Sequence, residues 1–209
     1  MSGQFFALEG IDGSGKTTQL KLLAQRLEAA GVPCLTTCEP TGRPIGKLLR
    51  QVLTGQVECD SRAAAPLFTA DRLDHLLNRE EGLCQAVEAG LTVLSDRYYF
   101  SSYAYQSVDL PLEWVIEANR PCAQLLRPTA TLFIDVSPEL ALARIAQSRE
   151  RTELFETRER LTRTREQYFK AFALEKDRET VIFIHGDRDV DAVSEEIWQA
   201  VSTLLPAGA

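Results

Sequence analysis

The sequence of 209 residues predicts an α/β fold, in which helices cover both faces of a five-stranded parallel sheet. Two observations support this class. Short apolar runs alternate along the chain with stretches of helical spacing, as in sheets built from helical crossovers. The runs are apolar throughout rather than alternating, which is typical of strands buried on both faces. The expected strands are 5–8, 32–37, 91–94, 131–136 and 180–184.

Helical stretches separate these strands. In the first of them, Leu20, Leu23 and Leu27 recur at helical spacing, and Gly31 is a natural stop. The expected helices cover 17–30, 45–53, 64–89 with a possible break near Gly82, 112–119, 140–148, 159–175 and 190–205. Because the chain has no internal repeat and no linker rich in Pro, Gly or Ser, we expect residues 1–209 to form one domain.

Composition and charge limit the possible partners. Hydrophobic residues make up 44% and charged residues 25% of the chain, both ordinary for a globular protein. The formal net charge is −7, whereas a protein that binds a nucleic acid backbone normally carries a basic excess. We therefore expect no polynucleotide partner. A mononucleotide is compatible with this balance, because a few local cations can bind it.

Cysteine and histidine usage indicates neither a disulfide framework nor a zinc site. The five cysteines form no Cys-x-x-Cys pair, and two histidines are too few to complete a zinc set. Reduced thiols are typical of a cytoplasmic protein. No apolar run reaches membrane-spanning length, and the first residues, MSGQFFALEG, lack the pattern of a signal peptide. We expect a cytoplasmic protein with no membrane contact.

A glycine-rich motif follows the first expected strand. Residues 10–17, GIDGSGKT, fit G-x-x-x-x-G-K-[ST], and a helical stretch follows them. Glycines let successive N–H groups face phosphate oxygens, Lys16 can reach the β- and γ-phosphates, and Thr17 can offer its hydroxyl to Mg²⁺. The residues expected to bind ATP are Gly10, Ile11, Asp12, Gly13, Ser14, Gly15, Lys16, Thr17 and Thr18. The alternative is a glycine-rich turn with a chance lysine.

This motif predicts a three-layer P-loop NTPase fold, but it does not define the reaction. The Asn-Lys-x-Asp sequence with which GTPases recognise guanine is absent. The Leu-Ser-Gly-Gly-Gln signature of ABC-type ATPases is also absent. A kinase needs a second pocket with its own phosphate-binding cations, and the rest of the chain supplies candidates for one.

Further segments, together with the P-loop, closely resemble thymidylate kinases. The resemblance runs from Phe5 to about Tyr168 in the same order and spacing. The matching segments are EGIDGSGKT at 9–17, CEPTG at 38–42, GKLLR at 46–50, FTADRLDH at 68–75 and DRYYFSSYAYQ at 96–106. This combination is specific to that family. It implies ATP and Mg²⁺ as cofactors, dTMP as the acceptor, and a homodimer.

The resemblance also implies how the acceptor is recognised. Phe68 would stack on the thymine ring and Arg72, one helical turn later, would donate to a thymine carbonyl. Ser102 and Gln106 lie where the base edge is read, and Tyr105 would exclude a ribose hydroxyl. The implied substrate-binding residues are Glu39, Arg50, Phe68, Arg72, Arg97, Ser102, Tyr105 and Gln106. Taken singly, Phe68 fits a core residue, Arg72 a solvated helix charge, and the tyrosines a cover for the sheet edge.

The phosphates and the metal would lie at the carboxyl ends of the strands, where open α/β sheets bind ligands. Arg97, with Arg50, would hold the monophosphate through its planar fork, although Arg97 alone also fits a pair with a structural carboxylate. Asp12 and Glu9 would lie close to both phosphates. Asp96 would join Thr17 in the metal shell.

A charged segment, 147–165, is either a solvated helical hairpin or a cover over the site. Some thymidylate kinases carry an arginine directly after the P-loop aspartate, where this chain has Gly13. By the family logic a lid at about 147–157 would supply the catalytic arginine, from Arg149 or Arg151. The predicted catalytic residues are Asp12, Lys16, Arg97, Arg149 and Arg151.

The sequence departs from the family pattern at two places. Cys38 stands where many members have arginine before Glu-Pro, and Leu154 replaces an arginine of the lid. We expect transfer of the ATP γ-phosphoryl group to dTMP. The alternatives are another nucleotide or deoxynucleoside kinase on the same fold and, in a different class, a P-loop binding protein without transfer activity.

Overall fold

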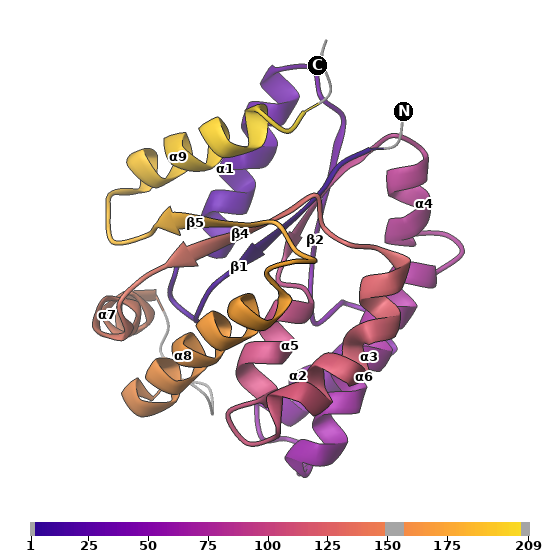
Figure 1. The fold of residues 1–209 in the computed structure, drawn as a ribbon, viewed down its shortest axis with the longest axis vertical. Helices are drawn as coiled ribbons and strands as arrows, with labels where there is room; N and C mark the ends of the chain where they lie inside the picture. Colours follow the sequence, from indigo (N-terminus) through magenta and orange to yellow (C-terminus); the bar gives the residue numbers. More distant parts are fainter. Residues whose placement is uncertain (1–2, 149–156, 206–209) are drawn as a thin grey trace.

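The computed structural model describes residues 3–148 and 157–205, and its strands form one parallel sheet in the order β2-β3-β1-β4-β5 (Figure 1). The strands are β1 (Phe5–Glu9), β2 (Cys34–Cys38), β3 (Thr92–Asp96), β4 (Ala130–Asp135) and β5 (Val181–His185). All five correspond to expected strands. The predicted α/β class with a five-stranded parallel sheet is therefore confirmed.

Helices cover both faces of this sheet. They are α1 (Lys16–Ala29), α2 (Pro44–Leu53), α3 (Ser61–Leu77), α4 (Leu83–Glu88), α5 (Tyr99–Gln106), α6 (Leu112–Leu125), α7 (Pro138–Ser148), α8 (Arg158–Glu175) and α9 (Val190–Ser202). In Figure 1, α1 and α9 pack together on one face, whereas α3, α5, α6 and α8 cover the other. No helix in the described ranges is both long and apolar enough to span a bilayer.

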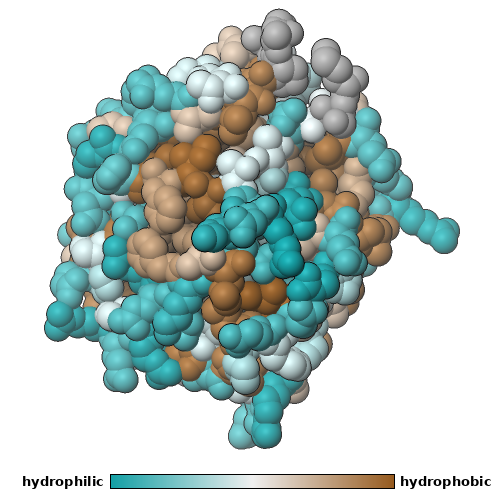
Figure 2. Space-filling view, viewed as in Figure 1, coloured by the Kyte–Doolittle hydropathy of each residue, from teal (hydrophilic) through white to brown (hydrophobic). Residues whose placement is uncertain are grey.

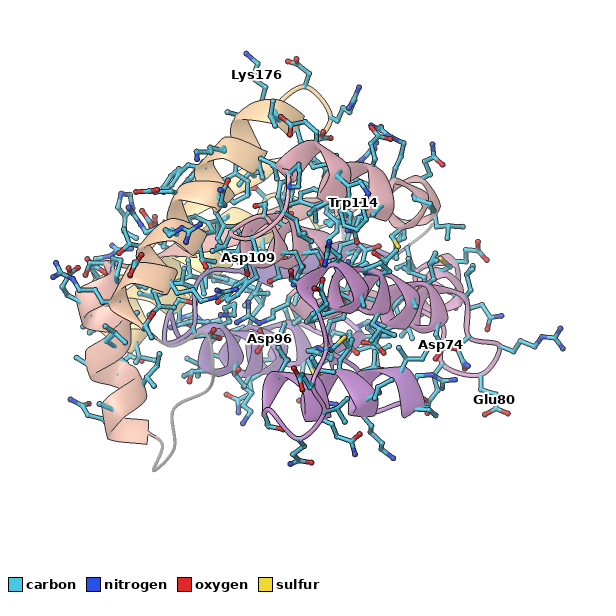
Figure 3. The ribbon with its side chains drawn as sticks, turned by 90° about the horizontal axis from the view of Figure 1, so that it is seen from below. Asp74, Glu80, Asp96, Asp109, Trp114 and Lys176 are labelled. Carbon is cyan, nitrogen blue, oxygen red and sulfur yellow. The ribbon has the colours of Figure 1, made fainter. Side chains whose placement is uncertain are left out.

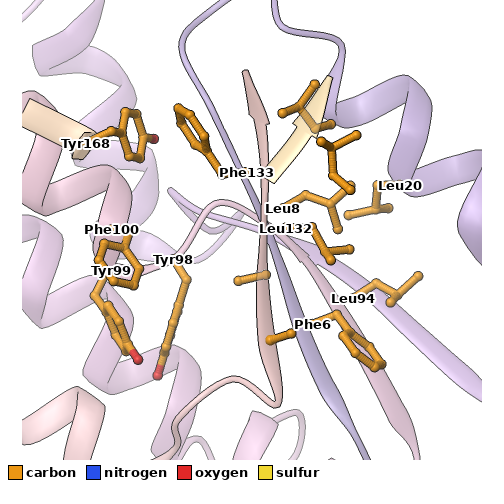
Figure 4. Close-up of a cluster of buried hydrophobic side chains, with 14 of the residues drawn as sticks. Phe6, Leu8, Leu20, Leu94, Tyr98, Tyr99, Phe100, Leu132, Phe133 and Tyr168 are labelled. Carbon is orange, nitrogen blue, oxygen red and sulfur yellow. The ribbon is translucent and has the colours of Figure 1, made fainter. Parts of the chain in front are cut away.

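The core lies on both sides of the central strands β1, β3 and β4 (Figure 4). There the aromatic side chains of Tyr98, Tyr99 and Phe133 pack on one side, and Leu20 of α1 lies toward the other. Edge strands are different, because β2 and β5 are only partly buried and Phe183 of β5 is 45% exposed. The expectation of strands buried on both faces is therefore wrong at the two edges. Over the face seen in Figure 2, polar and charged side chains separate small apolar groups.

The helices confirm one expectation and add one helix that was not expected. The long region 64–89 is two helices, α3 and α4, with Gly82 as the N-cap of the second, so the break near Gly82 is confirmed. Helix α5 was not expected, because its sequence YFSSYAYQ lacks helical patterning. A carboxylate distant in sequence stabilises its start, since Glu9 Oε1 accepts hydrogen bonds from the backbone N–H groups of Tyr98 and Ser101, at 2.7 and 3.1 Å.

The strand register brings the candidate site together. Cys38 of β2 and Leu8 of β1 both pair with Asp96 of β3, so the three strands end side by side. The connections that follow them begin with Glu39, Arg97 and the glycine-rich loop. Because parallel strands share one carboxyl edge, this register places those connections together at that edge.

Candidate active site

The glycine-rich loop joins β1 to α1 through backbone conformations that favour glycine. Gly10, Gly13 and Gly15 have positive φ angles of 148°, 79° and 95°. A Cβ atom on Gly13 would lie 2.4 Å from the carbonyl oxygen of Ala141, so this position excludes a side chain both by its dihedral angle and by space. The residue type that some thymidylate kinases carry here, arginine, does not fit this loop.

Lys16 is buried beneath the loop. Its Nζ donates to the carbonyl oxygens of Gly10 and Ile11, at 3.0 and 2.9 Å, and lies 3.4 Å from the Ser14 hydroxyl. Burial lowers the pKa of Lys16 to about 8, and the charge of Arg97 acts in the same direction. An anion in the loop would favour the ammonium form and reverse this shift.

A cavity of about 480 Å³ opens over the loop. Its lining comprises Asp12, Gly13, Ser14, Gly15, Lys16, Thr17, Thr18, Gln19, Asp96, Arg97, Arg144, Ile145, Gly186, Arg188, Val190 and Val193. We call it the donor cavity. Of the residues expected to bind ATP, those from Asp12 to Thr18 line it. Gly10 and Ile11 instead lie underneath and bind Lys16 through their carbonyl groups.

Thr17 and Asp96 offer oxygen ligands in the donor cavity. The Thr17 hydroxyl donates to Asp96 Oδ2 at 2.5 Å, so the two predicted metal-binding side chains lie in contact. Mg²⁺ prefers oxygen ligands and is commonly held by one or two protein side chains together with substrate phosphates, which this pair fits. Within 3–148 and 157–205, His, Cys, Asp and Glu side chains form no group of three or more suited to a metal. Figure 3 shows Asp96 near the middle of the molecule seen from below.

A second cavity, of about 270 Å³, lies beside the first. It is lined by Asp12, Glu39, Pro40, Arg50, Leu53, Thr54, Phe68, Arg72, Arg97, Ser101, Ser102, Tyr105 and Gln106. We call it the acceptor cavity. All eight residues predicted to bind the acceptor line it, although they come from the β2–α2 connection, α2, α3, the end of β3 and α5.

Helix α3 contributes Phe68 and Arg72 to the same wall. Phe68 is half-buried and lies outside the hydrophobic core, so the alternative of a core residue is wrong. Arg72 is only 1% exposed, so it is no solvated helix charge either. Its Nε lies 2.8 Å from Glu39 Oε2, and its guanidinium stands 5.4 Å from the ring centre of Tyr98. Burial alone would lower the pKa of Arg72, but the charge and hydrogen bond of Glu39, together with Cys122 and Tyr98, outweigh burial and raise the pKa.

Arg50 of α2 also lines the acceptor cavity, and its side chain is bound to the backbone. Its guanidinium donates to the carbonyl oxygens of Pro40 and Thr41, which fixes the turn after β2 against α2. Asp71 of α3 accepts from the backbone N–H and the hydroxyl of Thr41, at 2.8 and 2.6 Å. The turn that carries Glu39 is therefore tied to two helices.

Asp12 and Arg97 line both cavities. The Arg97 guanidinium donates to Asp12 Oδ1 and, at 2.9 Å, to the Ser101 hydroxyl. The Tyr105 hydroxyl donates to Asp12 Oδ2 at 2.9 Å and accepts from the Asp12 N–H at the same distance. Arg97 has a φ of 75°, which is uncommon for a residue with a side chain and is typical of functional sites. Two anions, one in each cavity, would meet at this arginine.

Glu9 was expected close to the phosphates, and this prediction is wrong. The carboxylate is completely buried and lines neither cavity. Besides the start of α5, it binds the hydroxyls of Ser101 and Tyr168, at 2.6 and 2.8 Å. Burial raises the pKa of Glu9, while these hydrogen bonds act in the opposite direction. Tyr98 and Tyr99 are also buried in the core rather than spread over the sheet edge.

Sequence reasoning missed several side chains at the site. Arg144 of α7 lines the donor cavity and donates to the carbonyl oxygen of Gly186 at 3.0 Å. Arg188 lines the same cavity from the loop after β5. Asn119 contacts Arg72, and His75, which ends the segment FTADRLDH, contacts Glu39; the sequence gives no sign of either contact. The lid candidates Arg149 and Arg151 lie outside the described residues.

The fold and the two adjoining cavities define a P-loop phosphotransferase with a separate acceptor site. The model of the thymidylate kinase family matches residues 8–197. A probable thymidylate kinase of Thermococcus kodakarensis is 37% identical over 96% of this chain and 98% of that protein. A putative thymidylate kinase of Aeropyrum pernix is 42% identical over 95% of this chain and 96% of that protein. A thymidylate kinase of Symbiobacterium thermophilum is 36% identical over 97% of this chain and 94% of that protein.

This chain therefore belongs to the thymidylate kinase family. The predicted resemblance and the predicted class of enzyme, a nucleoside monophosphate kinase, are confirmed at this level. The alternative of a P-loop protein without transfer activity is not supported.

Proposed function

We propose that this chain transfers the γ-phosphoryl group of ATP to dTMP, giving dTDP and ADP for dTTP synthesis. The observation that carries the proposal is the junction of the two cavities. Asp12 and Arg97 line both, so a triphosphate in the donor cavity and a monophosphate in the acceptor cavity would be held end to end. In-line phosphoryl transfer requires that alignment.

In the donor cavity, the loop N–H groups and Lys16 would bind the phosphates of ATP. Without a ligand, Lys16 donates hydrogen bonds to the loop carbonyls, and it would exchange these partners for the β- and γ-phosphates. Thr17 and Asp96 would hold Mg²⁺, which, when bound, neutralises charge on the ATP phosphates. Arg144 and Arg188 would line the space left for the nucleoside.

In the acceptor cavity, Phe68 would stack on the thymine ring and Arg72 would donate to a base carbonyl. Ser102 and Gln106 line the same cavity, and Gln106 Oε1 has no hydrogen-bond partner among the described residues. Tyr105, held by Asp12, would leave no room for a ribose hydroxyl. The acceptor phosphate would bind Arg97, with Arg50 nearby.

Catalysis would rest on charge neutralisation and alignment. Lys16, Arg97 and a lid arginine, Arg149 or Arg151, would spread the developing negative charge. Closure of the lid would exclude water and so suppress ATP hydrolysis. The acceptor phosphate is already an anion near pH 7, so no protein general base is required, and Asp12 would orient the acceptor side through Arg97.

We further propose a single-domain subunit that forms a homodimer in the cytoplasm. Apolar side chains at the surface of α3 and α6 support a self-association surface, since Leu77 is 56% and Trp114 43% exposed. The cysteines are all free thiols, as expected in a reducing compartment. Sedimentation at working concentration tests the dimer, and a monomer would contradict it.

A coupled assay of ADP formation tests the reaction, with ATP, Mg²⁺ and one acceptor at a time. We expect dTMP to be preferred over dUMP, dGMP, AMP and thymidine. Preference for any other acceptor would overturn the base assignment and favour a different nucleotide or deoxynucleoside kinase. ADP release without an acceptor would instead indicate a P-loop protein that does not transfer.

A further inference from the structure

A chain of polar groups, of which all but the half-buried Thr37 are buried, leads from β2 to the acceptor cavity. The Thr37 hydroxyl lies 2.8 Å from Nε2 of His75, and Nδ1 of His75 lies 3.0 Å from Glu39 Oε1. The other carboxylate oxygen of Glu39 binds Arg72 at 2.7 and 2.8 Å. His75 is 5% exposed and lines neither cavity, so it reaches the acceptor side only through Glu39.

The hydrogen atoms of Arg72 are almost fully committed before a ligand binds. A guanidinium carries five N–H groups. Nε and one N–H of Nη2 contact Glu39, and Nη1 donates to the Ser102 hydroxyl at 3.1 Å and to Asn119 Oδ1. One N–H of Nη2 is left for a ligand in the acceptor cavity. The direction of this remaining N–H is set by the Glu39 carboxylate, because the other N–H of the same Nη2 atom contacts Glu39.

The bond to His75 fixes the orientation of that carboxylate. An ionised carboxylate is only an acceptor, so Nδ1 of His75 must carry the hydrogen of this bond, while the Thr37 hydroxyl holds the other ring nitrogen, Nε2, at 2.8 Å. Without this donor, Glu39 Oε1 would be a buried acceptor with no partner, and the carboxylate could rotate. Arg72 would rotate with it and turn its remaining N–H away from the base.

We propose that His75 is a positioning residue for the acceptor base, acting through Glu39 on Arg72. This inference rests on the proposed dTMP kinase activity. It assigns to His75 a contribution to the binding of the acceptor, and none to ATP binding or to the transfer step. The expected signature is a change in KM for dTMP at nearly constant KM for ATP.

Two substitutions separate positioning from general packing. In His75→Asn, the side-chain NH₂ can take the place of Nδ1 and donate to Glu39, whereas in His75→Gln the amide lies nearer the place of Nε2 and can contact only Thr37. We expect His75→Gln to raise KM and Kd for dTMP about tenfold, because a hydrogen bond to a charged group is lost. We expect His75→Asn to stay within about twofold of the wild type.

Asp74→Asn is the matched control. Asp74 is the neighbour of His75 on α3 and pairs with Arg43 at 2.5 Å. Like His75, it ties α3 to the connection between β2 and α2, but it does not touch Glu39 or Arg72. Figure 3 shows Asp74 on this helix, away from Asp96. We expect no change in KM for dTMP in this variant. An increase in KM for dTMP as large as that in His75→Gln would mean that any loosening of α3 weakens acceptor binding. That result would overturn the inference.

Thr37→Val keeps the inference testable if His75→Gln does not fold. It removes only the hydroxyl that orients the ring, and we expect a rise of about two- to threefold in Kd for dTMP with Kd for ATP unchanged. If the wild type phosphorylates dTMP but neither Thr37→Val nor His75→Gln changes Kd for dTMP, the role of His75 is overturned and the proposed function is not. No dTMP turnover by the wild type would overturn the proposed function instead.

Discussion

The donor and acceptor cavities are built in opposite ways. The donor cavity is built around one continuous segment, from Asp12 to Thr18, whose backbone provides binding groups for phosphate. The acceptor cavity is assembled from separate elements, and its charged side chains are held by buried partners such as Glu39 and Asn119. A backbone site depends on a few glycine conformations, whereas a side-chain site depends on contacts that span the fold.

This difference separates general from selective recognition. Backbone N–H groups and one lysine bind any polyphosphate, so the donor cavity defines the kind of chemistry. Fixed side chains around the acceptor can distinguish one base from another, because a buried donor left without a partner costs free energy. Substitutions in the donor cavity should therefore lower turnover, whereas substitutions in the acceptor cavity should weaken the binding of the acceptor.

The largest effect should come from Lys16→Met. We expect kcat to fall by about a thousandfold or more, because the loop loses the cation that would reach the transferred phosphoryl group. Stability should not fall with it. Burial lowers the pKa of Lys16 in the folded protein, so removing the ammonium removes an unfavourable buried charge. Initial rates and thermal unfolding measure the two effects. A variant that retains a tenth of wild-type activity would contradict the proposed role.

Phe68→Ala should have a smaller effect, confined to the acceptor. We expect KM for dTMP to rise about ten- to hundredfold, since stacking of a base on an aromatic ring contributes about 1–3 kcal/mol. KM for ATP should not change. Phe68 lies outside the hydrophobic core, so the melting temperature should change little. Phe100→Ala is a matched control, because Phe100 is buried in the core and lines neither cavity. It should lower stability without this selective change in KM.

The smallest expected effect is the uptake of protons when ATP binds in the donor cavity. Since the pKa of Lys16 is about 8 without a ligand, about half of the molecules carry the ammonium at pH 8. Bound phosphates should raise this pKa, so ATP binding at pH 8 should be accompanied by the uptake of about half a proton from solution by Lys16. At pH 6.5 this uptake should be close to zero, because the group is already protonated. Calorimetry in buffers of different ionisation enthalpy measures it. Proton release at pH 8 would contradict the assignment.

The same contrast explains what the sequence could predict. The strands, most helices and the donor loop follow from local patterns, and the loop motif lies in consecutive residues. Helix α5 could not be expected, because its start is stabilised by Glu9, a residue about ninety positions away in sequence. Glu9 itself is one residue from the phosphate loop, yet its side chain points into the core.

The acceptor residues could be named from the family resemblance but not from their own pattern. Phe68 and Arg72 share a helix face with many ordinary residues, and nothing local shows that Arg72 is buried against Glu39. His75 lies in the same segment as Arg72, FTADRLDH, but nothing in that segment shows that it contacts Glu39, and Asn119 carries no motif at all. Their contacts depend on the packing of α3 against α6 and on the position of β2, which only the complete fold determines.

A crystal structure with dTMP and a non-hydrolysable ATP analogue would show directly whether the two phosphates meet at Arg97. We expect the phosphate of dTMP and the γ-phosphate of the analogue both to lie against Arg97, with the thymine ring on Phe68 and beside Arg72. If dTMP bound elsewhere, or if these three side chains turned away from it, the proposed arrangement of donor and acceptor would be wrong.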